Sequence, residues 1–137
     1  FGRHYFARHD YEELSATHAE AVMQAAAGAM AGLAGQKFAD WTVTVADDFS
    51  YRDKTDGSIA SDQGLRIVCG DDARAVLRLS GTGTKGATLR VYLERYAHGS
   101  GSLHWKPAEA LAPLASAIDR LARIAELTGR RTPDVVT

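Results

Sequence analysis

The segment at residues 78–94, RLSGTGTKGATLRVYLE, combines the residue types that proteins use to bind phosphate. Glycine-rich backbone can present successive N–H groups as a concave anion site, and hydroxyl side chains add further donors. The donors in this stretch are Ser80, Gly81, Thr82, Gly83 and Thr84. Arg78 and Arg90 flank them, and a guanidinium can hold a phosphate through two charge-assisted hydrogen bonds. The pattern predicts a phosphate site; the alternative is an ordinary hairpin loop with arginines on its surface.

The loop also matches G-x-G-x-x-G, with GTGTKG at residues 81–86. A dinucleotide-binding fingerprint needs a helix after the loop, but ATLRVYLERY alternates like a strand. A Walker loop needs G-K-[ST], and Lys85 is followed by Gly86. A kinase glycine loop lies between strands, yet the chain lacks the V-A-I-K and H-R-D motifs. What remains is a glycine-rich connection between two strands.

No other residue type gathers into a catalytic or metal-binding pattern. The histidines lack metal-ligand spacing, and we expect surface or packed side chains at His4, His9, His18, His98 and His104. Cys69 lies among apolar neighbours, which favours a core thiol. Ser80 has no evident His–Asp pair, so a hydrolase nucleophile is not predicted. We therefore expect a binding site with no catalytic residue and no metal ligand in this chain.

The elements around the loop predict an α+β fold. An alternating aromatic segment over 3–14 reads as a strand, and the alanine-rich segment 17–35 as a helix, with Thr17 and Glu20 at capping-box spacing. The later strands are expected within 37–51, 65–70, 73–80 and 87–96, and a last helix over 107–128, with a kink or a late start at Pro113. Short turns make the strands antiparallel. The prediction is β-α-β4-α: an antiparallel sheet of about four to five strands with two helices packed on one face.

Composition narrows the class of protein. A chain of 137 residues suits one domain, and its formal net charge of −1 argues against a nucleic-acid binder. One cysteine allows no internal disulfide, which fits a reducing, cytoplasmic location. There is no apolar run long enough for a membrane span and no signal peptide, so we expect no membrane partner. The chain begins at Phe1, as a mature terminus or a fragment would.

Four stretches of the chain resemble one family. RLSGTGTKGATLRVYLERY resembles the phosphate-binding loop of the fourth, C-terminal domain of phosphoglucomutase, in the α-D-phosphohexomutase superfamily. FGRHYFARHDYEE is similar to the segment that enters that domain, ADDFSYRDKTDGSIASDQGLRI to its long turn and strand, and TGRRTPDVVT to its C-terminal end. The extended form of the loop points to phosphoglucomutase over phosphomannomutase. Lys54-Thr55 departs from the usual Pro-Val, in a turn.

The resemblance implies a fold and a role. The fold would be TATA-box-binding-protein-like, with residues 1–137 forming one C-terminal phosphate-binding domain of a larger phosphohexomutase and residues 1–9 connecting it to the preceding domain. The family's phosphate-binding positions fall on Arg78, Ser80, Gly81, Thr82 and Arg90, with Gly83 and Thr84 in the same loop. Lys85 and Arg8 are candidates for minor contributions, and the alternative for Arg8 is an ordinary arginine at the edge of a strand. These residues would bind and orient the substrate phosphate that is not being transferred.

The resemblance also implies a reaction, that of an isomerase of glucose metabolism. The family interconverts glucose 1-phosphate and glucose 6-phosphate through glucose 1,6-bisphosphate, using a phosphoserine and Mg²⁺. The family's phosphoserine run, T-A-S-H-N-P, and metal run, D-G-D-G-D-R, are both missing from the sequence, and Asp47-Asp48 and Asp71-Asp72 are too short to replace the latter. We therefore expect Mg²⁺ to bind in the preceding domains of the same polypeptide, and the isolated chain to be inactive. The alternative is a free-standing binding module for another phosphorylated ligand or a protein partner.

Overall fold

The computed structural model of the chain describes residues 2–49, 63–83 and 86–137. Its elements, in chain order, are β1 (Gly2–Leu14), α1 (Ala16–Met30), β2 (Lys37–Phe38), β3 (Trp41–Thr42), β4 (Val45–Asp48), β5 (Gln63–Cys69), β6 (Ala73–Gly83), β7 (Gly86–His98), the 3₁₀ helix η1 (Ser100–His104), α2 (Pro107–Ala122), α3 (Ile124–Thr128) and β8 (Val135–Val136). Six of the strands form an antiparallel sheet in the order β4-β5-β6-β7-β1-β8, and β2 and β3 form a separate ribbon. The predicted α+β class is confirmed. The strand count is higher than expected.

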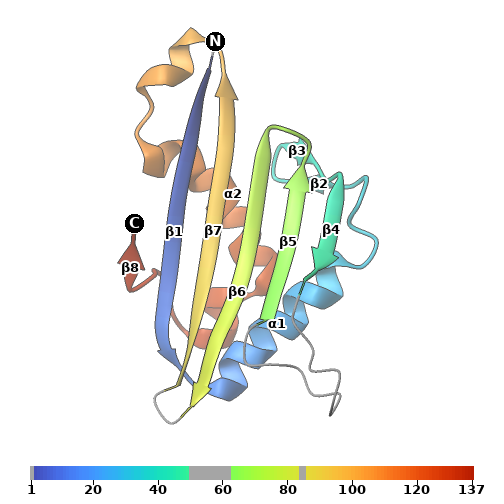
Figure 1. Cartoon of the computed structure of the whole chain (residues 1–137), viewed down its shortest axis with the longest axis vertical. Coiled ribbons are helices and arrows are strands. Elements are labelled where there is room, and N and C mark those ends of the chain that lie inside the picture. The colour runs from blue at the N-terminus through green and yellow to red at the C-terminus, as the bar shows by residue number, and fades with distance from the viewer. Residues whose placement is uncertain (1, 50–62, 84–85) are drawn as a thin grey trace.

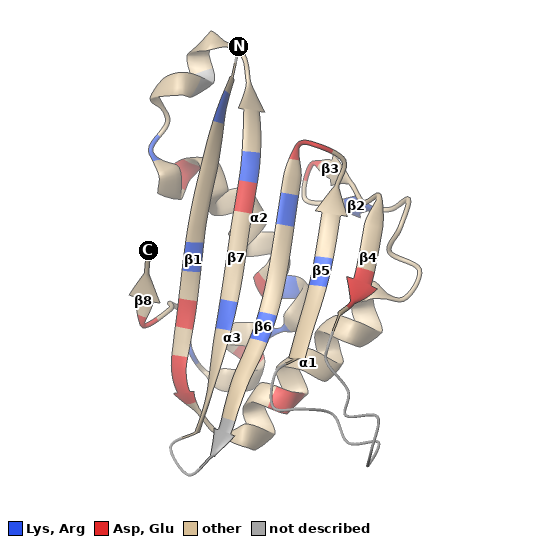
Figure 2. Cartoon of the chain, viewed as in Figure 1, with Lys and Arg blue, Asp and Glu red and all other residues tan. Residues whose placement is uncertain are grey.

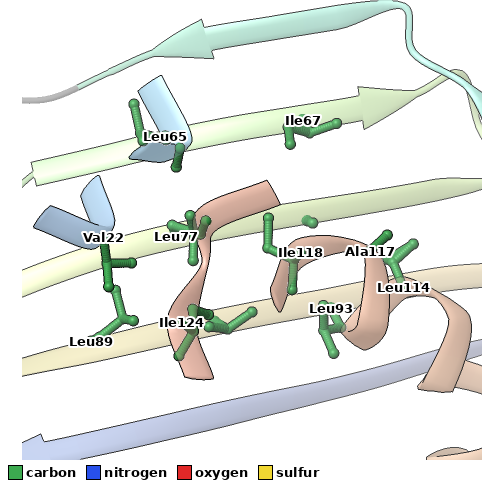
Figure 3. Close-up of a cluster of buried hydrophobic side chains, with 14 of the residues drawn as sticks. Val22, Leu65, Ile67, Leu77, Leu89, Leu93, Leu114, Ala117, Ile118 and Ile124 are labelled. Atoms are coloured by element: carbon green, nitrogen blue, oxygen red, sulfur yellow. The ribbon is translucent and has the colours of Figure 1, made fainter. Parts of the chain in front are cut away.

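The sheet has one covered face and one open face. Strand β7 alternates, with Leu89, Val91 and Leu93 buried and the residues between them half-buried. Successive side chains of a strand point to opposite faces, so this alternation separates a core face from a face without helices. Helices α1, α2 and α3 all lie on the core face (Figure 1). Figure 3 shows Val22 of α1 and Ile118 of α2 meeting leucines of the sheet.

Helix α1 begins earlier than the sequence predicts. Ser15 is the N-cap residue, and its Oγ accepts a hydrogen bond of 3.1 Å from the backbone N–H of His18. The predicted capping box on Thr17 and Glu20 is therefore wrong, because Ser15 takes the capping position two residues upstream. The helix also ends at Met30, before the predicted stop at Gly35. Its small buried residues, Ala19 and Ala26 among them, allow close approach to the sheet.

The predicted last helix is interrupted after Ala122 and not at Pro113. Helix α2 begins at Pro107 and contains Pro113, so a late start is excluded. The break comes at Arg123, which adopts the left-handed conformation with φ 56°. The carboxylate of Asp119 accepts a hydrogen bond of 3.0 Å from the N–H of Ala125, which is one of the free N–H groups in the first turn of α3.

No helix within residues 2–49, 63–83 and 86–137 is long and apolar enough to cross a membrane.

A short C-terminal strand, β8, was not predicted. It extends the sheet beyond β1, where the N–H of Arg8 donates to the carbonyl of Thr137 at 2.9 Å and the N–H of Thr137 donates back at 3.0 Å. The N–H of Asp134 donates to the carbonyl of Asp10 at 2.8 Å. The C-terminal tail therefore holds the middle of β1 on the edge that faces away from β7. Residues 2–9 themselves belong to β1 and pair with β7 on its other edge.

Candidate functional site

Arg78 and Arg90 lie directly opposite each other on the open face of the sheet. They are paired in the register of β6 and β7, and the side chain of Arg90 is 41% exposed. Figure 2 shows lysine or arginine positions on β1, β7, β6 and β5 across the middle of the sheet. Like charges placed directly opposite each other in a sheet are destabilising. An anion bound between the two guanidiniums would remove this repulsion.

The same row of the sheet continues on both sides of the two arginines. Gly64 of β5 is the partner of Arg78, and Asp10 of β1 is the partner of Arg90. A side chain added at Gly64 would overlap the ring of Phe49, which packs over this glycine. The row therefore places the two arginines between an aromatic ring and a carboxylate.

Asp10 connects Arg90 to a third guanidinium. Arg8 Nη2 donates to Asp10 Oδ2 at 3.0 Å, and Arg90 Nε lies 3.7 Å from Asp10 Oδ1. Asp10 is only 3% exposed and is the one buried charged residue in the part of the chain that the structure describes. Asp10 with Arg8 and Arg90, and Arg78 opposite Arg90, make an arginine cluster of three positive charges and one negative charge, which has a formal charge of +2. A dianionic phosphate monoester carries the complementary charge.

The glycine loop begins where β6 and β7 lose their regular register. Ser80 pairs with Thr88, and the register shifts before Gly83 pairs with Gly86. Gly86 has φ 86°, and a Cβ there would lie 2.7 Å from the carbonyl oxygen of Leu14. Only glycine fits this close approach to the end of β1. Gly86 is therefore packed against the end of β1, and Ser80 lies across from Thr88 on the neighbouring strand.

The structure brings most of the predicted site residues to the open face, between the middle of the sheet and the end that carries the glycine loop. Ser80, Arg78 and Arg90 share this face, and Arg8 lies on it two strands from Arg78. Gly81 follows with φ 71°, and the backbone of Thr82 and Gly83 completes β6. Thr84 and Lys85 lie outside the described residues. Sequence reasoning missed Asp10 and Thr88, which only the strand register places beside Arg90 and Ser80.

A pocket of about 510 Å³ adjoins the arginine cluster on the open face. Its lining includes Phe6, Arg8, Phe49, Arg66, Arg78 and Tyr92. Arg66 is already held by Asp47, through hydrogen bonds of 3.0 Å and 2.6 Å that lower the pKa of the Asp47 carboxyl. Arg78, in contrast, has no ion-pair partner among the described residues. Arg78 and Arg74, which also lines the pocket, are therefore the guanidiniums of this pocket without an ion pair among the described residues, and of the two only Arg78 lies opposite another arginine.

Two of the residues predicted to lie outside the site, Cys69 and His9, are on the opposite, core face of the sheet. Cys69 is buried on the core face of β5, and burial raises the pKa of its thiol. His9 points to the core face, where burial lowers its pKa, partly offset by the charge of Asp10. No group of three or more His, Cys, Asp or Glu side chains in residues 2–49, 63–83 and 86–137 is arranged to hold a metal ion.

Comparisons with known proteins agree on one family. A family model described as "Phosphoglucomutase-1, C-terminal domain" matches residues 3–134. The chain is 39% identical to phosphoglucomutase-1 of Oryctolagus cuniculus over 143 residues, which is 100% of this chain and 25% of the relative. It is 40% identical to "Phosphoglucomutase, cytoplasmic" of Bromus inermis over 146 residues, again 100% of this chain and 25% of the relative.

A solved structure gives the same result. The open form of the Paramecium phosphoglucomutase known as pp63/parafusin superposes with a TM-score of 0.78 at 34% identity, over 98% of this chain and 23% of that one. The chain thus spans about a quarter of the length of the relatives it matches. Because the family model covers nearly the whole sequence, the chain belongs to the family of phosphoglucomutase-1 C-terminal domains.

Proposed function

We propose that this chain is the substrate-phosphate-binding domain of a phosphoglucomutase that interconverts glucose 1-phosphate and glucose 6-phosphate. The observation that carries the proposal is the cross-strand pair of Arg78 and Arg90 on the open face of the sheet. Membership of the C-terminal domain family supports the link to this enzyme. In this proposal residues 1–137 form one domain, which connects to the preceding domains of the same polypeptide through residues 1–9.

The arginine cluster explains how the domain holds a phosphate. Arg78 and Arg90 approach the phosphate from two neighbouring strands, and each can donate two N–H groups to its oxygens. Ser80 and the glycine-rich backbone that follows it add neutral donors at the same end of the sheet. Because the charge of the cluster matches a dianion, the site is suited to a phosphate monoester such as a hexose phosphate.

The role of this chain is to bind and orient, while the chemistry takes place elsewhere. The sequence has neither the T-A-S-H-N-P run of the family's phosphoserine loop nor the D-G-D-G-D-R run of its metal loop. We assign both the phosphoserine and the Mg²⁺ to the preceding domains, where the metal would neutralise charge on the transferring phosphoryl group. Holding the distant phosphate fixes the sugar relative to those groups, and such orientation lowers the barrier to transfer.

The compartment and the substrates follow from the same proposal. A cytoplasmic location is supported by the name of the Bromus inermis relative and by a lone, buried cysteine. The ligands of the cluster are then glucose 1-phosphate, glucose 6-phosphate and the bisphosphate that connects them. A domain that held the same phosphate outside a mutase would bind these ligands equally well, so only the preceding sequence distinguishes the two.

An NMR titration of the chain with glucose 6-phosphate tests the proposal. We expect weak binding, about millimolar, because the groups that hold the sugar and the second phosphate lie outside this chain. The backbone amides that shift should lie within residues 78–90. Arg78→Ala and Arg90→Ala should remove most of the binding, and Arg90→Lys should weaken it because an ammonium lacks the planar fork. Lys85→Ala should matter much less.

Arg74→Ala is the matched control for this titration. Arg74 lies on β6 and on the same face as Arg78, but its cross-strand partner is Glu94 and not an arginine. Its loss should change the affinity by less than about twofold. The proposal is wrong if the shifting amides lie outside residues 78–90, or if Arg74→Ala or Lys85→Ala abolishes binding while Arg90→Ala does not.

A further inference from the structure

Asp10 is buried beside a site that should bind an anion, and this position needs an explanation. Its side chain is 4% exposed, whereas the side chains of its neighbours Arg8 and Arg90 are 38% and 41% exposed. A buried carboxylate is unfavourable unless it is paired and hydrogen-bonded. A negative charge next to a phosphate site also repels the ligand. The carboxylate therefore opposes phosphate binding through its charge, and any benefit must come through the arginines that it contacts.

The two oxygens of Asp10 are used differently. Oδ2 accepts a hydrogen bond from Arg8 Nη2 at 3.0 Å. Oδ1 lies 3.0 Å from Arg8 Nε and 3.7 Å from Arg90 Nε, and it accepts a hydrogen bond from neither. Both Nε atoms are themselves buried without a hydrogen-bond partner. A small rotation of the Arg90 side chain would thus satisfy a buried donor and a buried acceptor together.

The backbone of Asp10 is held in place from the other side. Its carbonyl accepts from the N–H of Asp134, and Arg8 exchanges two backbone hydrogen bonds with Thr137. Strand β1 is thus paired on both edges at this point, with β7 on one side and β8 on the other. The carboxylate is a fixed acceptor against which a long, flexible arginine can be oriented.

An acceptor at Nε determines how the rest of a guanidinium is presented. The group is planar and carries five N–H donors in a rigid fork, so one hydrogen bond at Nε fixes the plane and leaves the terminal nitrogens for an anion. Arg90 has an acceptor within reach of its Nε, Asp10 Oδ1 at 3.7 Å, while Arg78 has no carboxylate partner among the described residues. The two arginines of the pair are therefore not equivalent.

We propose that Asp10 is a positioning residue of the phosphate site, which holds Arg90 in the orientation that binds the phosphate. This inference rests on the proposed function, since it presumes that Arg90 contacts phosphate. On phosphate binding, the 3.7 Å contact between Arg90 Nε and Asp10 Oδ1 closes to a hydrogen bond. If only the charge of Asp10 mattered, neutralising it would strengthen phosphate binding. If Asp10 positions Arg90, neutralising it weakens phosphate binding.

The test compares inorganic phosphate affinity of the wild-type chain with that of Asp10→Asn, by NMR titration. If Asp10 positions Arg90, the variant binds phosphate about tenfold more weakly, even though the cluster has become more positive. Asp47→Asn is the matched control: it removes the same charge from a carboxylate that pairs with an arginine on the same face, and its affinity should be unchanged or slightly higher. Asp10→Asn binding as tightly as wild type, or more tightly, overturns the inference.

Two further readouts separate positioning from a general loss of structure. In an Arg90→Lys background, which weakens binding without removing it and has no Nε–H to orient, Asp10→Asn should change phosphate affinity by less than about twofold. An undiminished effect there contradicts the inference. In the phosphate-bound wild-type chain, the Nε–H of Arg90 should exchange with water much more slowly than that of Arg78. Equal exchange rates overturn the inference even if Asp10→Asn does not fold. If the wild-type chain fails to bind phosphate, the proposed function fails first, and this inference with it.

Discussion

Arg78 and Arg90 repel each other in the absence of a ligand, and the sheet tolerates this strain at one cross-strand position. Replacing Arg78 with the neutral Gln keeps a long polar side chain and removes the repulsion. We expect Arg78→Gln to raise the melting temperature by about 1–3 °C in phosphate-free buffer while phosphate binding is lost. Thermal melts with and without phosphate check this. A variant that is less stable than wild type without phosphate contradicts the idea that this pair is strained.

His9 should make the stability of the chain depend on pH. Burial lowers the pKa of His9 in the folded chain, with the charge of Asp10 partly offsetting the shift. Between the folded pKa and the unfolded value near 6.5, the unfolded chain binds more protons, so stability falls as the pH is lowered through this window. The melting temperature should therefore drop between pH 7.5 and about 5.5, and it should drop less in His9→Gln. Equal drops in the two chains would show that His9 does not contribute.

At the scale of the elements, Gly86 and Gly81 should tolerate alanine very differently. Both have positive φ, 86° and 71°, which is unfavourable for alanine by about 1–2 kcal/mol. A Cβ at Gly86 would also lie 2.7 Å from the Leu14 carbonyl oxygen, whereas at Gly81 the nearest atom is 3.8 Å away. We expect Gly86→Ala to destabilise the chain by about 2–4 kcal/mol and Gly81→Ala by about 1–2 kcal/mol, measured by urea unfolding. The reverse order would mean that Gly86 is not packed against the end of β1.

Elements with strong periodicity were predictable, and elements that depend on distant partners were not. Strand-like sequence along β1, β6 and β7 predicted their strands, and one apolar face predicted the helix α2, for which a late start at Pro113 was expected as an alternative. Strand β8 has only two residues and forms because it pairs with β1, more than a hundred positions earlier. The break at Arg123 was hidden because an arginine in the left-handed conformation has no favourable local signal.

The residues of the site also fall into those that local sequence could predict and one that depends on a distant strand. Arg78, Ser80 and Arg90 could be found because phosphate-binding residue types lie close together around one glycine loop. Asp10 could not be found, because nothing in its own neighbourhood relates it to residue 90. Its place beside Arg90 is a consequence of the register between β1 and β7, which the sequence does not specify directly.

At the scale of the whole molecule, the chain is about a quarter of the relatives it matches. We expect it to fold alone, because its core joins all three helices to the sheet, and yet to be inactive as a mutase. A coupled assay with glucose 1-phosphate, Mg²⁺ and the bisphosphate should give the background rate. Turnover by the pure 137-residue chain, proportional to its concentration, would contradict the assignment of the phosphoserine and the metal to preceding domains.

The central claim is that a substrate phosphate binds between Arg78 and Arg90 on the open face of the sheet. A crystal structure of the chain soaked in glucose 6-phosphate tests it most directly. The account predicts phosphate density with oxygens about 2.7–2.9 Å from guanidinium nitrogens of both arginines, beside Ser80. Phosphate bound at Arg66 or Arg74 instead, with Arg78 and Arg90 making no contact to it, would contradict the claim.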